Sequence, residues 1–63
     1  MRRGHRGDHV KRWQQFLIAL DHLEGAADGI FGRKTEDATQ SFQAIERIGT
    51  DGIAGPMTLA AAV

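Results

Sequence analysis

The stretch DGIFGRKT, residues 28–35, decides the fold, because the chain repeats it almost unchanged as DGIAGPMT at residues 51–58. In each copy the aspartate can accept hydrogen bonds from the backbone N–H groups just beyond it, which forms an Asx turn. The next glycine tolerates a positive φ that other residues resist. A second glycine turns the chain again, and a threonine follows in the first turn of a helix. The repeat therefore predicts two similar loops that each begin a helix.

The isoleucine of each copy is expected to fix its loop to the core, at Ile30 and at Ile53. A repeated turn can serve only as a scaffold that starts helices. A rigid loop with free backbone N–H groups at a helix start also suits a carboxylate or an amide ligand. The residues alone leave both interpretations open.

Apolar residues before the first loop follow a helical spacing. Steps of three and four place four of them on one helix face: Val10, Trp13, Leu17 and Leu20. Asp8 stands where an N-cap accepts free amide groups of the first turn, and Gly7 before it allows a sharp turn. We therefore predict a helix from about Asp8 to Leu20.

Both loops lead into further helical segments. Residues 33–47 repeat the helical spacing after the first loop, with Thr35, Ala38, Phe42 and Ile45 on one face. After the second loop, Pro56 suits the first helical position, and MTLAAAV at residues 57–63 continues as a short helix. With little strand signal, the sequence predicts an all-α fold. We expect a compact three-helix bundle whose two similar Asp-Gly-Ile-x-Gly loops lead into the second and third helices.

A chain of 63 residues has room for one domain, here residues 1–63. Its core is expected from apolar residues of the helices and loops: Val10, Trp13, Leu17, Ile30, Phe42, Ile48, Ile53 and Leu59. Trp13 is either a core residue or a platform for a sugar, and its place on the apolar face favours the core. Its indole N–H then needs a hydrogen-bond partner.

Composition argues against several kinds of site. Eight basic and eight acidic residues cancel, so net charge makes no case for nucleic acid, although basic residues gather in the first twelve positions. No apolar run approaches the roughly 20 residues of a membrane helix. No apolar stretch follows the basic start, as it would in a signal peptide. The absence of cysteine excludes disulfides and thiolate metal sites.

Metal binding and catalysis find little support. His5 and His9 have a spacing found in metal sites, but no third ligand is evident, and zinc needs three or four. No histidine is paired with a nucleophile, and a small helical domain lacks walls for a water-excluding pocket. We predict no catalytic residue, no metal and no cofactor.

Three pieces of the chain, in order, resemble the small three-helix peptidoglycan-binding domain attached to bacterial and phage cell-wall hydrolases. RRGHRGDHVKRWQQFL at residues 2–17 resembles its opening, with spaced glycines, a valine and a glutamine within the helix. ADGIFGRKTEDATQSFQ at residues 27–43 resembles its central signature, which ends in phenylalanine and glutamine. DGIAGPMTLAAAV at residues 51–63 resembles its closing repeat. The resemblance covers nearly the whole chain.

The resemblance implies a non-catalytic module that targets an attached hydrolase to peptidoglycan. Its implied partners are the stem peptide, the adjoining amino sugar or both, and a tethered catalytic domain. We also expect a monomer at the cell wall, extracellular or periplasmic, with neither nucleic acid nor membrane as a partner. A small three-helix module that binds nucleic acid or another protein is the alternative.

The chain departs from the family's pattern at Trp13, at the pair Asp21–His22, and at the pair Glu46–Arg47. The family usually has leucine at the first position and often Gly-Tyr at the second. It commonly has Asn-Gly where Glu46 and Arg47 stand, which is an easy left-handed helix stop. We therefore expect the second helix to run longer, or to stop at Gly49.

We place the ligand at the first loop and the helix that it opens: Asp28, Gly29, Phe31, Gly32, Arg33 and Thr35. Phe31 stands where the second copy has Ala54, so only the first copy offers an aromatic face. Arg33 stands where the second copy has Pro56, and its guanidinium suits a stem-peptide carboxylate. Free N–H groups at the helix start favour the same anion. The competing interpretation has Phe31 in the core and Arg33 simply solvated.

Overall fold

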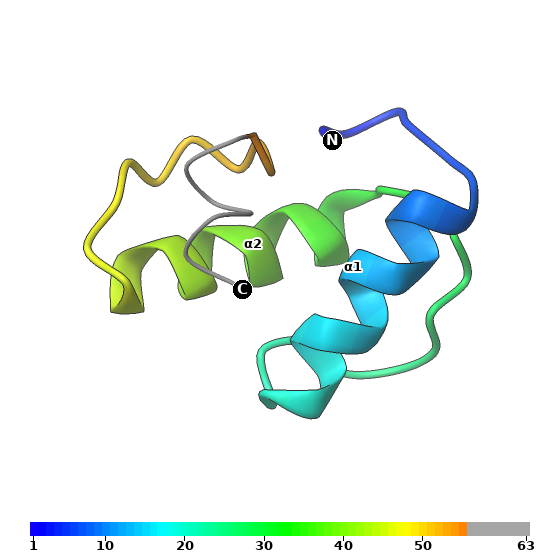
Figure 1. Cartoon of the computed structure of the whole chain (residues 1–63), viewed down its shortest axis with the longest axis horizontal. Helices are drawn as coiled ribbons and strands as arrows, with labels where there is room; N and C mark the ends of the chain where they lie inside the picture. The colour runs from blue at the N-terminus through cyan, green and yellow to red at the C-terminus, as the bar shows by residue number, and fades with distance from the viewer. Residues whose placement is uncertain (56–63) are drawn as a thin grey trace.

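The computed structural model describes residues 1–55, which form two α-helices, Asp8–Ala19 (α1) and Arg33–Ile45 (α2). The two helices pack against each other, and residues 46–55 return along α2 toward the beginning of the chain (Figure 1). The helical prediction is confirmed for this part of the chain, which contains isolated bridge pairing but no strand. The third helix predicted over residues 56–63, and Leu59 within it, lie outside the described residues. Neither α1 nor α2 has the length and apolar character needed to cross a bilayer.

Helix α1 begins one residue away from the predicted cap. Gly7 occupies the N-cap position with no side-chain hydrogen bond, and Asp8 is the first residue of the helix. Gly7 has φ 131, which a residue with a Cβ rarely adopts. Its N–H donates to the carbonyl of Gly29 at 2.9 Å and its carbonyl accepts from Lys11 at 3.1 Å. The sharp turn therefore falls at the glycine, and the prediction of Asp8 as N-cap was wrong.

Both helices end in a Schellman motif without glycine. At the end of α1, Asp21 has φ 61, and the N–H of His22 donates back to Leu17 at 2.8 Å. At the end of α2, Arg47 has φ 58, and the N–H of Ile48 donates back to Gln43 at 3.0 Å. The expected extension of the second helix, or its stop at Gly49, is thus wrong: α2 ends at Ile45 because Arg47 itself takes the left-handed conformation.

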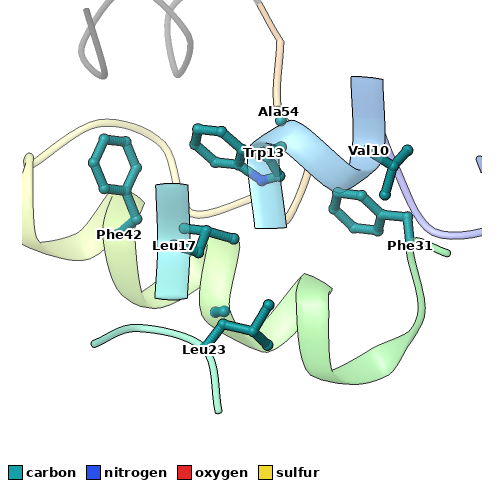
Figure 2. Close-up of a cluster of buried hydrophobic side chains, with 8 residues drawn as sticks. Val10, Trp13, Leu17, Leu23, Phe31, Phe42 and Ala54 are labelled. Carbon is teal, nitrogen blue, oxygen red and sulfur yellow. The ribbon is translucent and has the colours of Figure 1, made fainter. Parts of the chain in front are cut away.

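The core lies between α1, α2 and the two loops (Figure 2). Its buried apolar residues are Val10, Trp13, Leu17, Leu23, Phe31, Ala38, Phe42 and Ala54. Val10, Trp13, Leu17 and Phe42 were predicted correctly, while Leu20, on the predicted face of α1, is 48% exposed. Ile45, on the predicted face of α2, is 67% exposed, because the buried face is turned toward Thr39 and Gln43 instead.

The isoleucines of the two loops are not the core anchors that the sequence suggested. Ile30 is 47% exposed, and Ile53 is half-buried, as is Ile48. The residue after each loop isoleucine points inward instead: Phe31 is 1% exposed and so is Ala54. Successive residues of an extended segment point to opposite sides, so a shift of one residue exchanges the inner and outer side chains.

Trp13 belongs to an aromatic cluster with Phe16 and Phe42. Its ring stacks on Phe16 at 5.4 Å between centroids and meets the edge of Phe42 at 5.6 Å. Its indole N–H donates to the Thr39 hydroxyl at 3.0 Å, and that hydroxyl donates to the Thr35 carbonyl at 2.8 Å. The core interpretation of Trp13 is confirmed, and the partner that its indole N–H needs is Thr39.

The N-terminal segment, residues 1–7, pairs with both loops. The N–H of Gly4 donates to the carbonyl of Phe31, and the N–H of Phe31 donates to the carbonyl of His5, both at 2.9 Å. Met1 makes the same two-way pairing with Ala54, at 2.8 and 2.7 Å. Phe31 and Ala54 occupy equivalent positions in the two loops, so the N-terminal segment makes backbone hydrogen bonds to the same position of each loop. Figure 1 shows the resulting proximity of the N-terminus and the orange 51–55 stretch.

Candidate functional site

The first loop is locked by a buried glutamine of α1. Gln14 is 2% exposed. The two hydrogens of its amide nitrogen are shared among three acceptors, the Asp28 carboxylate at 3.0 Å, the Ile30 carbonyl at 2.9 Å and the Thr35 hydroxyl at 2.9 Å. Its amide oxygen accepts from the N–H of Gly29 at 2.8 Å. One side chain thus connects the beginning of the loop, its middle and the first turn of α2.

The second loop is locked in the same way by Gln43 of α2. Its amide nitrogen donates to Asp51 at 2.9 Å and to the Ile53 carbonyl at 3.0 Å, and its oxygen accepts from the N–H of Gly52 at 3.0 Å. Gly29 and Gly52 have φ 78 and 73. The prediction of two matching loops is therefore confirmed at the level of dihedral angles and hydrogen bonds.

Each loop aspartate closes the Asx turn that the sequence predicted. Asp28 accepts the N–H of Ile30 and Asp51 accepts the N–H of Ile53, both at 2.9 Å. These backbone hydrogen bonds, followed by those from Gln14 and Gln43, hold the pKa of each carboxyl below its ordinary value of 3.8. Both aspartates are therefore ionised in the folded domain at neutral pH.

A hollow of about 330 Å³ opens beside the first loop. It is lined by Gln14, Leu23, Glu24, Gly25, Ala26, Asp28, Ile30, Gly32, Arg33, Lys34 and Thr35. Four of the six residues predicted for the ligand are among them: Asp28, Gly32, Arg33 and Thr35. Gly29 is buried against Gln14, where its N–H serves the loop.

Phe31 is placed in the core, as the competing interpretation of the sequence had it. Its side chain is 1% exposed and lies with Val10 and Trp13 in the buried cluster (Figure 2). The ring therefore offers no aromatic face to a ligand. Arg33 is exposed at the rim of the hollow, where its guanidinium is accessible.

One wall of the hollow comes from the linker between α1 and the first loop. Leu23, Glu24, Gly25 and Ala26 all belong to it. The linker folds back under the Schellman turn of α1, and Leu23, 7% exposed, anchors it to the core. The corresponding linker after α2 is shorter, spanning residues 46–50 against residues 20–27.

Sequence reasoning missed several residues of this site. Gln14 and Gln43 were recognised only as parts of a family pattern, and the residue type alone does not mark them, because Gln15 and Gln40 on the same helices are exposed. No sequence pattern indicated that Lys34 and Glu24 line the hollow, because exposed charged residues follow no periodicity. Within residues 1–55, no group of three metal-ligating side chains comes together.

The family follows from the sequence match. Residues 6–62 match the family described as "Putative peptidoglycan binding domain". The chain belongs to this family. The match includes both glutamine-locked loops and the hollow beside the first of them.

The chain is also similar to individual proteins. The chain is 42% identical over 53 residues to the N-acetylmuramoyl-L-alanine amidase CwlM of Mycobacterium tuberculosis, covering 84% of the chain and 13% of that protein. It is 42% identical over 55 residues to an uncharacterized protein in the bpoA1 3' region of Kitasatospora aureofaciens, covering 86% of the chain and 47% of that protein. The chain thus spans less than half the length of these two curated relatives.

Two solved structures share the fold of the domain. The SleB N-terminal domain superposes with a TM-score of 0.96 at 32% identity, covering 98% of this chain and 85% of that one. The Burkholderia AP3 phage endolysin gives a TM-score of 0.92 at 40% identity, covering 98% of this chain and 24% of that one. The same domain therefore occurs within longer proteins, among them an amidase and an endolysin.

Proposed function

We propose that this chain is a non-catalytic module that binds peptidoglycan and brings an attached hydrolase to the cell wall. Its ligand is the stem peptide, the adjoining amino sugar or both. The proposal draws support from family membership and from the relatives, which include an amidase and an endolysin. The module acts outside the cell or in the periplasm, and as a monomer.

The observation that carries the proposal is the hollow beside the first loop. Its floor is fixed, because Gln14 holds the Asp28 carboxylate, the Ile30 carbonyl and the Thr35 hydroxyl in one network. A fixed floor loses little conformational freedom when a ligand binds, which favours recognition by a shallow site. The residues that we assign to the ligand are Asp28, Gly32, Arg33 and Thr35, and the remaining two, Gly29 and Phe31, shape the loop from beneath.

The mechanism is targeting. A small open hollow offers few contacts, so one module binds weakly. A tethered catalytic domain then stays near the polymer at a high effective concentration, without any new contact of its own.

The test combines sedimentation with insoluble peptidoglycan and NMR titration with a soluble muropeptide. We expect the chain to sediment with the polymer and the largest amide shifts to fall at residues 23–35. Arg33→Ala should weaken binding with the fold intact by circular dichroism, whereas the control Arg12→Ala, on the exposed face of α1, should not. A DNA shift assay at low and physiological salt is run beside it. Sedimentation at background level, or binding to DNA alone, would overturn the proposal.

A further inference from the structure

Each loop of the repeat begins with an Asp-Gly pair, Asp28–Gly29 in the first loop and Asp51–Gly52 in the second. In such a pair the backbone nitrogen of the glycine can attack Cγ of the aspartate, because glycine has no Cβ to hinder the approach. The chain has no asparagine, and its other aspartates precede residues that carry side chains: Asp8, Asp21 and Asp37. Rearrangement of the backbone by this reaction should therefore concentrate in the two loops.

The rearrangement gives up one water and takes one back. The glycine nitrogen bonds to Cγ, and one oxygen of the neutral carboxyl group leaves as water with the proton of that nitrogen, which closes a five-membered succinimide ring. Water then opens the ring at either of its carbonyl groups. Opening at Cγ restores aspartate. Opening at the former backbone carbonyl leaves isoaspartate, in which the chain runs through Cβ and Cγ and is longer by one carbon atom.

In the folded domain, both reacting groups of the first pair are engaged in hydrogen bonds. The N–H of Gly29 is buried and donates to the Gln14 amide oxygen at 2.8 Å. One oxygen of the Asp28 carboxylate accepts the N–H of Ile30 at 2.9 Å and the Gln14 amide at 3.0 Å. Ring closure needs a nitrogen that can lose its proton and a carboxyl group that can turn toward it, so the hydrogen bonds of Gln14 must open first.

The second pair is held in the same way from α2. The N–H of Gly52 is buried and donates to the Gln43 amide oxygen at 3.0 Å, and one Asp51 oxygen accepts the Gln43 amide and the N–H of Ile53, both at 2.9 Å. In both loops the backbone hydrogen bond, followed by that of the glutamine, holds the pKa of the carboxyl below 3.8. Little of the neutral acid, whose oxygen can leave as water, is therefore present at neutral pH.

We propose that the two Asp-Gly pairs are modification sites, at which isoaspartate forms when the hydrogen bonds of the loop glutamine open. Gln14 protects Asp28, and Gln43 protects Asp51. The protection is specific to each loop, because each glutamine holds both the nitrogen and the carboxylate of its own pair. Isoaspartate lengthens the loop by one carbon and displaces the carboxylate, so the modified loop cannot close in the same form again. This proposal does not depend on the ligand of the domain.

The first measurement compares the folded chain with the same chain in denaturing urea, both at neutral pH. Peptide mapping locates isoaspartate, with chromatographic separation of the isomeric peptides followed by mass spectrometry. We expect isoaspartate at both Asp28 and Asp51 in urea, and formation about tenfold slower or more at each in the folded chain, because hydrogen bonds must open before the ring closes. Equal rates in the folded and the unfolded chain at either residue would overturn the proposal.

Two variants test whether each glutamine protects its own loop. In Gln14→Leu, isoaspartate should form about tenfold faster at Asp28 than in the parent, and at the parent's rate at Asp51. Gln43→Leu should give the reverse pattern, so each variant carries a control in its other loop. Gln15→Leu, at an exposed position of α1, should leave both rates unchanged. Acceleration at both residues in a variant that circular dichroism shows to be folded, or at neither, would overturn the proposal.

Amide exchange in the parent gives a test that stays decisive even where a variant does not fold. The N–H groups of Gly29 and Gly52 belong to the attacking nitrogens and donate to the glutamine oxygens, so their exchange with solvent reports the opening directly. The loop whose glycine exchanges faster should form isoaspartate faster, relative to its rate in urea and by about the same factor. The opposite order, or unequal rates of isoaspartate formation with equal amide exchange, would overturn the proposal.

Discussion

The two loops of this domain share a lock but differ in their surroundings. Gln14 holds residues 28–32 and Gln43 holds residues 51–55 through equivalent hydrogen bonds. Only the first loop has the long linker of residues 20–27 beside it, and four residues of that linker line the hollow beside this loop. The glutamine lock is therefore a scaffold common to both halves. What turns one copy into a candidate binding site is the linker placed next to it.

The loops also differ in the size of the residue that enters the core. Phe31 and Ala54 occupy the same inward position, and each exchanges two backbone hydrogen bonds with the N-terminal segment. The first loop therefore contributes a large ring to the core and the second a single methyl group. The difference makes the first loop the more heavily anchored of the two.

The largest effect is expected from Phe31→Ala. Removing a fully buried ring should lower the free energy of unfolding by about 3–5 kcal/mol, which approaches the whole stability of a domain this small. Urea denaturation monitored by circular dichroism measures it. Ile30→Ala, at the neighbouring exposed position, is the matched control and should cost far less. Equal losses would show that the inward and outward positions of the loop are wrongly assigned.

Removal of either lock should be nearly as costly. Gln14→Leu and Gln43→Leu each leave a buried backbone N–H without its acceptor, and they remove the glutamine donor from the loop carboxylate and from the loop carbonyl. We expect a loss of about 2–4 kcal/mol for each. The exposed neighbour of Gln14 supplies the control Gln15→Leu, which should change stability little. A large loss in one half only would break the equivalence of the two locks.

The loop aspartates should make stability depend on acid pH. Their pKa values are lower in the folded domain than in the unfolded chain, so their contribution is complete above the ordinary value of 3.8 and is lost as the pH falls through the folded value. Stability should therefore decrease below about pH 4. Asp28→Asn and Asp51→Asn should each flatten that decrease, and the double variant should flatten it most. Thermal melts between pH 2 and 7 measure how stability depends on pH, and the exposed Asp37→Asn is the control. If stability of the double variant fell with pH as steeply as that of the parent, the pH dependence would not come from Asp28 and Asp51.

The smallest effect should be a gain in stability at the two helix ends. Asp21 and Arg47 adopt φ 61 and 58, a conformation that costs most residues about 1–2 kcal/mol and glycine almost nothing. Part of the gain is offset because glycine loses more freedom on folding. Arg47→Gly should therefore stabilise by about 0.5–1 kcal/mol, and Asp21→Gly by less, because aspartate tolerates this conformation better. Destabilisation by Arg47→Gly would show that the arginine side chain contributes a contact that outweighs the strain.

Patterns in the sequence were sufficient for α1, α2 and the two Asx turns, because periodicity and turn chemistry are local properties. They placed Val10, Trp13, Leu17 and Phe42 in the core, where the helical spacing is unambiguous. The short loops gave no such spacing, so Ile30 was assigned to the core in place of Phe31, whose backbone is hydrogen-bonded to the N-terminal segment.

The candidate site was predictable only in part for the same reason. Asp28, Gly32, Arg33 and Thr35 belong to the repeated loop and could be found from it. Leu23, Glu24 and Gly25 come from a linker without repeat or periodicity, and they reach the loop through the fold. The left-handed conformation of Arg47 could not be predicted either, because arginine does not indicate the end of a helix.

The pairing of the N-terminal segment with both loops has a consequence for the order of folding. The lock of the second loop joins residues 8 positions apart, that of the first loop joins residues 14 apart, and Met1 meets Ala54 across 53 positions. Closing the longest of these costs about 1.7 kcal/mol more chain entropy than closing the shortest. The second lock should therefore form first and the N-terminal pairing last. By the same argument this pairing is the first to open, so the amide protons of Gly4 and Ala54 should exchange with solvent while both glutamine locks remain closed.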